Sequence, residues 1–306
     1  ICLMSVKILE VNQDNNGRRL DNYLISIFKN IPKSKIYNII RKGEVRINSG
    51  RVKPHKKIKT GDQIRIPPYL DNIDKNVIAI NPKLHSSVED NIVFDNNNFL
   101  ILNKPYGISV HSGSKNNFGI IDIAREIYGS SMDLCHRIDK ETSGCLVLSK
   151  NKQSNKWFNN QLVTNKVKKK YVAIIKGHLK KTIKVNTLID KHFINQSKSF
   201  VNAANGKEAI SSFKLKKLLN SSCFVEIDIF TGRTHQIRVQ SSHIGHPILN
   251  DAKYGDKNFN KTISPKKIKR MALHSSEIRF VDQDGIKIHA ESEIDEAFTI
   301  LLDTLK

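Results

Sequence analysis

The sequence predicts an α+β protein, in which a mixed, mostly antiparallel central sheet with flanking helices follows a small α/β unit. The chain has 306 residues, enough for one full-sized and one small domain, each with its own core. From about residue 91 onward, short apolar runs alternate with turns, and helical stretches intervene. Residues 1–67 carry a separate basic pattern, and residues 68–90 hold prolines and asparagines with little periodicity. We therefore expect a small domain at 1–67, a linker at 68–90 and a large domain at 91–306.

Apolar spacing in the first segment predicts two helices followed by two strands. The helical positions are Leu20, Leu24, Ile27 and Phe28 in the first helix and Ile36, Ile39 and Ile40 in the second. Gly43 stands just past the second helix, where a glycine commonly ends one. Val45 and Ile47 alternate with polar neighbours as a strand does, and residues 63–66 form a second strand before two prolines.

Cations crowd the polar positions of this small unit. They are Lys33, Lys35, Arg41, Lys42, Arg46, Arg51, Lys53, Lys56 and Lys57. Two helices and a hairpin with cations on one side can bind the phosphate backbone of a nucleic acid, and Lys33, Lys35, Arg41, Lys42 and Arg46 are our candidate contacts. Few aromatic residues accompany them, which favours recognition of shape and backbone over base stacking. The alternative is a solvated basic surface without a ligand.

The large domain shows the sheet pattern most clearly. Expected strands cover residues 98–103, 145–150, 169–177, 213–219 and 224–230, and a helix covers residues 154–163. Residues 293–305 place apolar side chains on one helical face, which predicts a terminal helix packed on the core.

The charge balance indicates a polyanionic partner. The sequence has 51 Lys and Arg against 29 Asp and Glu, a formal net charge of +22. Such a field suits nucleic acid or an anionic membrane surface. No apolar run approaches the roughly 18–20 residues of a membrane span, and residues 1–9 do not resemble a signal peptide, so RNA or DNA is favoured. A lysine excess from biased codon usage is the competing explanation.

Metal, redox and nucleotide-cofactor chemistry are not indicated. Cys2, Cys135, Cys145 and Cys223 form no C-x-x-C pair, and we expect reduced thiols in a cytoplasmic protein. The histidines at 235, 243 and 246 do not have a common ligand spacing. Neither a G-x-x-x-x-G-K-[ST] nor a G-x-G-x-x-G motif is present. We therefore expect no cofactor and no metal.

The segment HRIDKETSGCLVLSK, residues 136–150, is the strongest candidate for chemistry. It sets Asp139 between Arg137 and Lys140, and a turn at residues 142–144 leads into an apolar strand. Cations around a turn at the mouth of a rigid strand favour an ionised carboxylate. A solvated turn with surface ion pairs is the alternative. A hydrolytic glycosidase fits poorly, because no second carboxylate partner is apparent.

Two resemblances then emerge. The motifs RRLDNYL, IPKSKIYNIIRKGEVRIN and KTGDQIRIP resemble the S4 RNA-binding domain. In the large domain NKPYGISVHSG, HRIDKETSG, KKYVAII and TGRTHQIRVQ occur in the order seen in a pseudouridine synthase family, whose signature is H-R-[LI]-D-x-x-[ST]-[ST]-G. The resemblance implies the pseudouridine synthase fold and the isomerisation of uridine within RNA. It also implies that the protein needs no metal or organic cofactor and acts as a monomer. IPKSKIYNIIRKGEVRIN and DAKYGDKNF point to members that act on large-subunit (23S) ribosomal RNA.

The resemblance also implies roles for individual residues. Asp139 is the catalytic carboxylate, Arg233 its cationic partner, and Tyr171 stacks on the flipped uracil. Arg137 fills the gap that the flipped base leaves in the RNA, and His136 and Arg238 contact the substrate. We further expect a helix after Arg233, with Thr234 as N-cap and Gly245 at C′.

Two questions stay open at this point. Asp139 either adds to the pyrimidine ring, attacks the sugar carbon or supports elimination to a glycal, and the sequence does not distinguish them. The alternative functions are an RNA-binding ribosome-assembly factor without catalysis, or the same reaction on another RNA such as transfer RNA.

Overall fold

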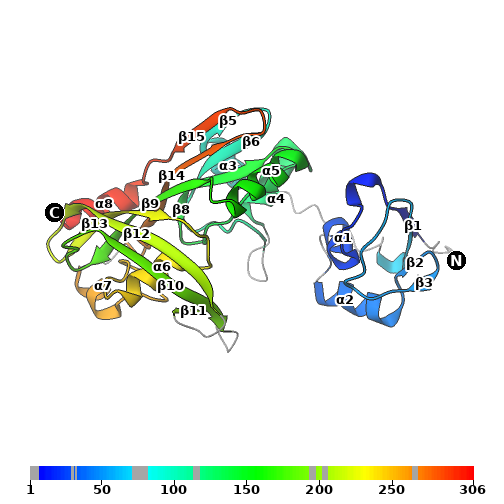
Figure 1. Ribbon diagram of the computed structural model, residues 1–306, viewed down its shortest axis with the longest axis horizontal. Coiled ribbons are helices and arrows are strands. Elements are labelled where there is room, and N and C mark those ends of the chain that lie inside the picture. Colours follow the sequence, from blue (N-terminus) through cyan, green and yellow to red (C-terminus); the bar gives the residue numbers. More distant parts are fainter. Residues whose placement is uncertain are drawn as a thin grey trace. The chain divides into compact units, whose positions relative to one another are not determined.

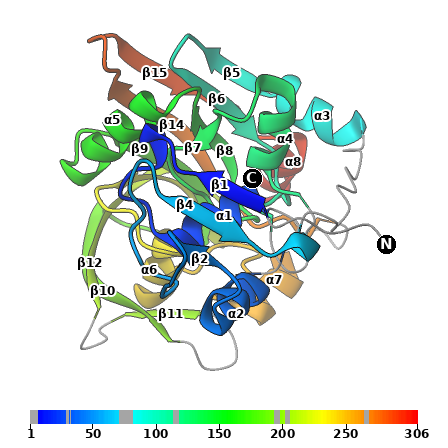
Figure 2. The ribbon, with the colours of Figure 1, turned by 90° about the vertical axis from the view of Figure 1, so that its right-hand side faces the viewer.

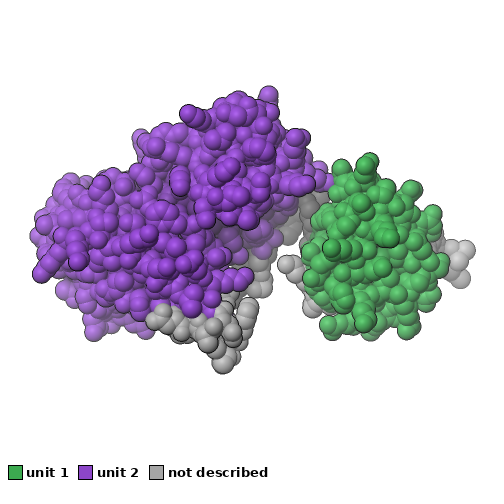
Figure 3. Space-filling model, in the orientation of Figure 1, with its two compact units in different colours: residues 1–79 green, residues 80–306 purple. Residues whose placement is uncertain are grey.

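A computed structural model describes residues 7–28, 31, 33–70, 82–112, 118–192, 198–201, 206–263 and 268–306. The chain divides into two compact units, Ile1–Ala79 and Ile80–Lys306 (Figure 3). Each unit has its own hydrophobic core.

The first unit is a small α/β module. Its elements are β1 (Lys7–Glu10), η1 (Gln13–Asn15), α1 (Leu20–Ile27), α2 (Lys33–Lys42), β2 (Arg46–Ile47), β3 (Gly50–Arg51), β4 (Gln63–Ile66) and η2 (Pro68–Leu70). Among the described residues four strands form an antiparallel sheet in the order β1-β4-β2-β3. Both expected helices are confirmed, and α2 ends before Gly43, whose φ of 76° suits glycine. Strand β1 was not anticipated, because its KILE sequence lies mostly exposed and has no clear alternation.

A buried carboxylate joins the two helices of this unit. Asp21 is fully buried; it accepts hydrogen bonds from Arg19 Nη2 at 2.5 Å and from the Tyr37 hydroxyl at 2.8 Å. Burial alone would raise the pKa of Asp21, but the hydrogen bonds from Arg19 and Tyr37 outweigh it and lower the pKa. Asp21 therefore stays ionised, and it ties α1 to α2 while Lys35, Arg41 and Lys42 of α2 remain at the surface.

The second unit is built on one large sheet. Its helices are α3 (Pro82–Glu89), α4 (Ile120–Tyr128), α5 (Lys152–Val163), α6 (Gln236–His243), α7 (Lys257–Ile263) and α8 (Glu296–Thr304). Its strands are β5 (Ile92–Asp95), β6 (Phe99–Lys104), β7 (Asp133–Leu134), β8 (Ser143–Ser149), β9 (Lys168–Lys176), β10 (Ile183–His192), β11 (Lys198–Val201), β12 (Lys207–Leu218), β13 (Ser222–Ile229), β14 (Leu273–Val281) and β15 (Lys287–Glu291).

The strand order explains how distant parts of the chain meet. The sheet runs β11-β10-β12-β13-β9-β14-β8-β6-β5, with β15 paired to β14 and β7 to β8 (Figure 1). Within the described residues every pairing is antiparallel except that of β14 with β8. This confirms the mixed, mostly antiparallel sheet. Because β14 lies between β8 and β9, it joins the two halves of the sheet.

Different helices pack on the two halves of the sheet. Helix α5 packs on β7 and β8, α4 packs beside α3 and β7, and α6 lies against β10 and β11 (Figure 2). The terminal helix α8 buries Phe298 and Leu301 in the largest core, as the apolar spacing predicted. Helix α3 falls in the range that we assigned to a linker, and it belongs to the second unit.

Three buried thiols lie in this unit. Cys135, Cys145 and Cys223 are free, and burial raises the pKa of each, so they are inert thiols. Cys2 lies outside the described residues. None of the described helices combines the length and the apolar character that a membrane span requires.

The parallel contact between β8 and β14 depends on a glycine. Gly144 has a φ of 104°, and a Cβ added there would lie 2.2 Å from the Ser275 carbonyl oxygen. The backbone of β14 thus approaches β8 where only a hydrogen atom fits. Strand β8 is buried along its whole length, so the sheet cannot move aside.

We expect Gly144→Ala to destabilise the second unit by about 3 kcal/mol or more, from the clash together with the strained φ. Chemical denaturation followed by circular dichroism measures this change. Gly129→Ala is the matched control, because its φ of 97° is similar but an added Cβ meets nothing within 4 Å. Equal losses of stability in the two variants would refute the role of the close approach.

Candidate active site

Asp139 lies in the connection between β7 and β8. The Thr142 N–H donates to the Asp139 carbonyl oxygen at 3.1 Å, which closes a turn directly before β8 begins at Ser143. The side chain of Asp139 is 19% exposed, and the fully buried strand behind it gives a rigid support. A reactive carboxylate held in this way keeps one side open to a substrate.

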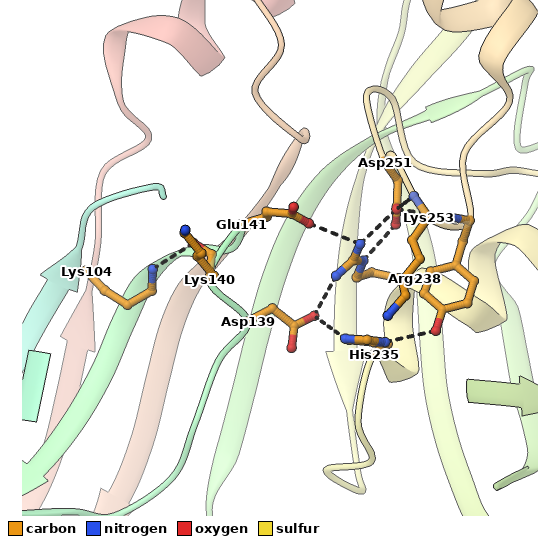
Figure 4. A network of polar contacts seen from close by, with 9 residues as sticks. Lys104, Asp139, Lys140, Glu141, His235, Arg238, Asp251 and Lys253 are labelled. Carbon is orange, nitrogen blue, oxygen red and sulfur yellow. Dashed lines mark hydrogen bonds and ion pairs between the residues drawn. The ribbon is translucent and has the colours of Figure 1, made fainter. Parts of the chain in front are cut away.

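Arg238 is the cation that pairs with Asp139. Its Nη1 donates to Asp139 Oδ2 at 3.0 Å, and its Nη2 donates to Glu141 Oε2 at 3.2 Å (Figure 4). The arginine lies on α6 with 4% of its side chain exposed. A guanidinium at this distance is a strong, charge-assisted hydrogen-bond donor to a carboxylate.

Asp251 holds Arg238 in place from the other side. It accepts from Arg238 Nε at 2.7 Å and from Nη2 at 2.8 Å, and its own side chain is fully buried. The backbone N–H groups of Lys253 and Tyr254 also donate to Asp251. Burial alone would raise the pKa of Asp251, but the bonds from Arg238 outweigh it and lower the pKa. The bidentate pair leaves Nη1 of Arg238 directed at Asp139.

His235 lies next to the same carboxylate. It is the N-cap residue of α6, in a left-handed conformation with a φ of 56°. Its Nε2 lies 3.8 Å from Asp139 Oδ2, and its Nδ1 is hydrogen-bonded to the Tyr254 hydroxyl at 2.8 Å. Burial lowers the pKa of His235, so the imidazole is neutral at pH 7. The expected N-cap Thr234 is thus wrong by one residue, whereas Gly245 follows the C-cap Ile244 with a φ of 81°, as expected for C′.

The expected pairing of Asp139 with Arg233 is wrong. Arg233 is exposed, and its Nε donates to the Glu208 carbonyl oxygen on β12 at 2.9 Å. It precedes α6, whereas Arg238 lies within the helix on the face that meets the β7–β8 connection. The arginine from distant sequence is therefore present, but five residues later than predicted.

Tyr171 lies on β9 and is 7% exposed. Burial raises the pKa of its hydroxyl, while a hydrogen bond with Ser275 acts in the opposite direction and the charge of Asp139 adds to the increase. The phenol is therefore neutral, and it lies near enough to Asp139 to respond to its charge.

Two buried cations support the loop that carries Asp139. Lys104 is fully buried and donates to the carbonyl oxygens of Pro105, Ile108 and Lys140 at 2.8, 2.9 and 3.3 Å. Burial lowers its pKa to about 7, although the charge of Asp139 opposes this shift. Arg270 donates to the Ser143 hydroxyl at the start of β8 and to Asp295 at 2.8 Å. These bonds hold the chain directly after Asp139, at Lys140 and Ser143.

The other predicted site residues have different surroundings. Arg137 is exposed, as a residue that contacts RNA should be. His136 instead faces the protein: its Nε2 accepts from the Val147 N–H at 3.1 Å, and its ring stacks on Phe158 with centroids 6.0 Å apart. Burial lowers the pKa of His136 to about 3. This environment makes His136 a neutral residue that positions the loop, whereas Arg137 beside it is open to solvent.

The five candidate phosphate contacts of the first unit lie on α2 or, for Arg46, on β2. Lys35, Arg41 and Lys42 are exposed, and Lys35 Nζ lies 5.8 Å from the centre of the Tyr69 ring. Arg46 on β2 donates to the Gly43 carbonyl oxygen at 3.2 Å. Lys33 begins α2, and its side chain lies outside the described residues.

One cluster of metal-ligand type occurs in the part of the chain that the structure describes. Glu277, His289 and Glu291 bring their ligand atoms within 4.8 Å of one another on β14 and β15. Arg279 and Lys170 already form ion pairs with Glu277. The cluster is thus a cross-strand ion-pair network on an open sheet face.

Comparison with known proteins shows which families the chain resembles. Residues 98–243 match a family model described as RNA pseudouridylate synthase, and residues 18–64 match the S4 domain model. The protein named ribosomal large subunit pseudouridine synthase C of Haemophilus influenzae is 38% identical, over 99% of this chain and 96% of its own length. The protein of the same name from Buchnera aphidicola subsp. Schizaphis graminum is 39% identical, over 98% of both chains.

Solved structures agree as well. Human RNA pseudouridylate synthase domain containing 4 is 25% identical, with a TM-score of 0.60 over 73% of this chain and 95% of its own. With relatives this similar over nearly the entire sequence, and with the fold and both family models in agreement, the chain belongs to the pseudouridine synthase family.

Proposed function

We propose that this protein converts uridine to pseudouridine in large-subunit ribosomal RNA, with Asp139 as the catalytic carboxylate. The relatives that match it from end to end carry the name of a synthase for that substrate. The net charge of +22 and the S4 domain favour a large structured RNA as partner.

The reaction sets clear requirements. The bond between N1 of uracil and C1′ of the ribose breaks, and a bond between C5 and C1′ forms. The proton on C5 leaves and N1 gains one, so nothing is oxidised or reduced. The target base must first leave its stack, which costs a few kcal/mol and is offset by binding. A carboxylate that acts as nucleophile or base must be ionised while largely removed from water.

The contact between Asp139 and Arg238 is the observation that carries this proposal. Asp139 remains accessible, and Arg238 supplies a permanent positive charge that Asp251 orients. Tyr171 is a neutral phenol close to this carboxylate, suited to stack on a flipped uracil and to exchange a proton through its hydroxyl. Arg137 and Arg233 are exposed cations for the RNA around the flipped nucleotide.

Release of tritium from C5 tests the reaction directly. Unmodified large-subunit ribosomal RNA, transcribed with [5-³H]uridine, is incubated with the protein, and transfer RNA labelled in the same way is run in parallel. We expect release from the ribosomal RNA and pseudouridine at specific positions in it. Binding without release would support an assembly factor instead, and release from transfer RNA alone would overturn the substrate.

The first unit is proposed to bind the RNA backbone. Arg41 and Lys42 are exposed at the end of α2, away from the buried residues of the unit. We expect the double variant Arg41→Gln, Lys42→Gln to bind RNA more weakly. The slope of log affinity against log salt should fall by about 0.7–0.9 for each phosphate that the variant no longer neutralises.

Turnover at saturating RNA should stay within about two-fold of the wild-type value, because neither side chain belongs to the second unit. Replacement of Lys59, an exposed lysine elsewhere in the unit, by Gln is the control. An unchanged salt slope in the double variant would exclude α2 as a phosphate contact.

We also propose that the protein acts as a monomer in the cytoplasm, where its ribosomal substrate is made. Asp139 and Arg238, the two residues of the proposed catalytic pair, come from one chain, which supports a monomer. Sedimentation velocity at micromolar concentration should give a single species near the 34.8 kDa of the chain.

A further inference from the structure

Three consecutive lysines at the start of β9 have different surroundings. Side chains alternate between the two faces of a strand, so Lys168 and Lys170 share one face while Lys169 shares the other with Tyr171. Lys168 is exposed, and Lys170 lies 3.7 Å from both Glu226 and Glu277. Lys169 alone of the three is directed to the face of the sheet that carries the catalytic site.

The Lys169 ammonium lies close to two loops of the site. A Cβ built on Gly232, in the loop before α6, would lie 3.6 Å from Lys169 Nζ. The charge of Lys169 also acts on His136, three residues before Asp139, and lowers its pKa. Lys169 therefore lies beside both the segment that leads to Asp139 and the segment that leads to Arg238.

This cation lacks an anionic partner among the residues that the structure describes. No ion pair or hydrogen bond of its ammonium occurs there, whereas Arg238, Lys104 and Arg270 each make several. Burial lowers the pKa of Lys169 to about 8, and no carboxylate opposes that shift. A positive charge that has lost much of its water without gaining a counter-charge is unfavourable in the free protein. An anion from the substrate would relieve that cost.

We infer that Lys169 binds a backbone phosphate of the RNA next to the flipped uridine, an inference that rests on the proposed function. Phosphate is the anion that RNA brings into the site, since uracil itself is neutral. The carboxylate of Asp139 is already paired with Arg238, so Lys169 is not needed to neutralise it. Lys169 is thus a positioning residue: its contact holds the extruded nucleotide in register with Asp139 and Tyr171.

Substitutions of the three lysines separate this role from a structural one. We expect Lys169→Gln to raise the Kd for RNA and the KM by about 10-fold, the size of one charge-assisted hydrogen bond, and to lower the salt slope by about one. Lys168→Gln and Lys170→Gln should each change the Kd and the KM by less than about two-fold, because their side chains lie on the other face of the strand. The unfolding temperature of RNA-free Lys169→Gln should equal or exceed that of the wild type, since a poorly hydrated charge is removed. A lower unfolding temperature, or equal effects for all three variants, would overturn the inference.

A neutral phosphate gives the second test. A short RNA fragment that the wild-type enzyme modifies is made with a methylphosphonate, in turn, at each phosphate flanking the target uridine. At one position the substitution should weaken binding to the wild type about 10-fold yet have no further effect on Lys169→Gln. Independent effects at every position would contradict the contact. Wild-type protein that binds the fragment but releases no tritium would instead refute the proposed function, so the two failures are distinguishable.

The pH dependence of binding provides a readout that a packing role would not move. The pKa of Lys169 is lowered to about 8 in the free protein, so above this pH the lysine must take up a proton in order to bind a phosphate. The affinity of the wild-type protein for RNA should therefore fall more steeply between pH 7.5 and about 9.5 than the affinity of Lys169→Arg, because the guanidinium of the variant stays charged. Identical pH profiles would exclude Lys169 from the phosphate contact.

Discussion

Asp139→Asn is expected to reduce the turnover number by about 10⁴-fold or more, while RNA binding stays within a few-fold of the wild-type value. The amide is close in size to the carboxylate and can still accept a hydrogen bond from Arg238, so the site should keep its shape. It cannot act as an anionic nucleophile or base. Tritium release under single-turnover conditions measures the chemical step, and filter binding measures affinity.

Glu141→Gln is the matched control for this variant. Glu141 also accepts a hydrogen bond from Arg238, at 3.2 Å, but 42% of its side chain is exposed. Loss of its charge should therefore change turnover by less than about ten-fold. Normal turnover in Asp139→Asn would refute the assignment of the catalytic residue, whatever the control showed.

Substitution of Arg238 should have the second-largest effect. Arg238→Gln removes the positive charge at Asp139, and we expect turnover to fall by about 10²- to 10³-fold, as for other charge-stabilising donors in active sites. Arg233→Gln should reduce it by less than about ten-fold and act mainly through KM, because Arg233 is exposed and bonded to the β12 backbone. If Arg233→Gln proved the more damaging to turnover, Arg238 would be excluded as the functional partner of Asp139.

Stability provides an independent check on Arg238. Its loss leaves the fully buried Asp251 without its bidentate partner, which should cost about 3–5 kcal/mol. The lowered pKa of Asp251 stabilises the wild type at pH values above its unfolded pKa, and this contribution is lost as pH falls through the folded pKa. Wild-type stability should therefore fall more steeply than that of Arg238→Gln as acid is added below about pH 4.

Much of the architecture was predictable from local sequence. Strand β8 is a continuous apolar run, β4 alternates before two prolines, and α8 repeats its apolar residues every three to four positions. Strand β14 was missed because its LHSSEIRFV sequence mixes buried polar residues with apolar ones: His274 and Ser275 face hydrogen-bonding partners inside the sheet. Polar residues satisfied by tertiary contacts leave no periodic signal.

The position of the proposed catalytic carboxylate was predictable from the sequence, and its arginine partner was not. Asp139 stands in a turn before a strand, which sequence shows directly, but the choice between Arg233 and Arg238 depends on where α6 begins. His235 starts that helix from a left-handed conformation that a histidine adopts only rarely. The sequence signal was weak, because it shows only that Arg238 stands between Ile237 and Val239. The structure shows residues 236–241 to be buried, and a buried arginine requires carboxylates around it.

The insertion of β14 between β8 and β9 has a consequence for biosynthesis. A chain emerging from the ribosome completes β8 and β9 well before residues 273–281 exist, so the two half-sheets wait with open edges for a strand that is translated later. Unpaired edges are sites of aggregation. A message truncated after the codon for Asn260 would yield a product that already contains Asp139, Arg238 and Asp251 but lacks the strand that joins the two half-sheets. We expect this product in the insoluble or degraded fraction of the cell.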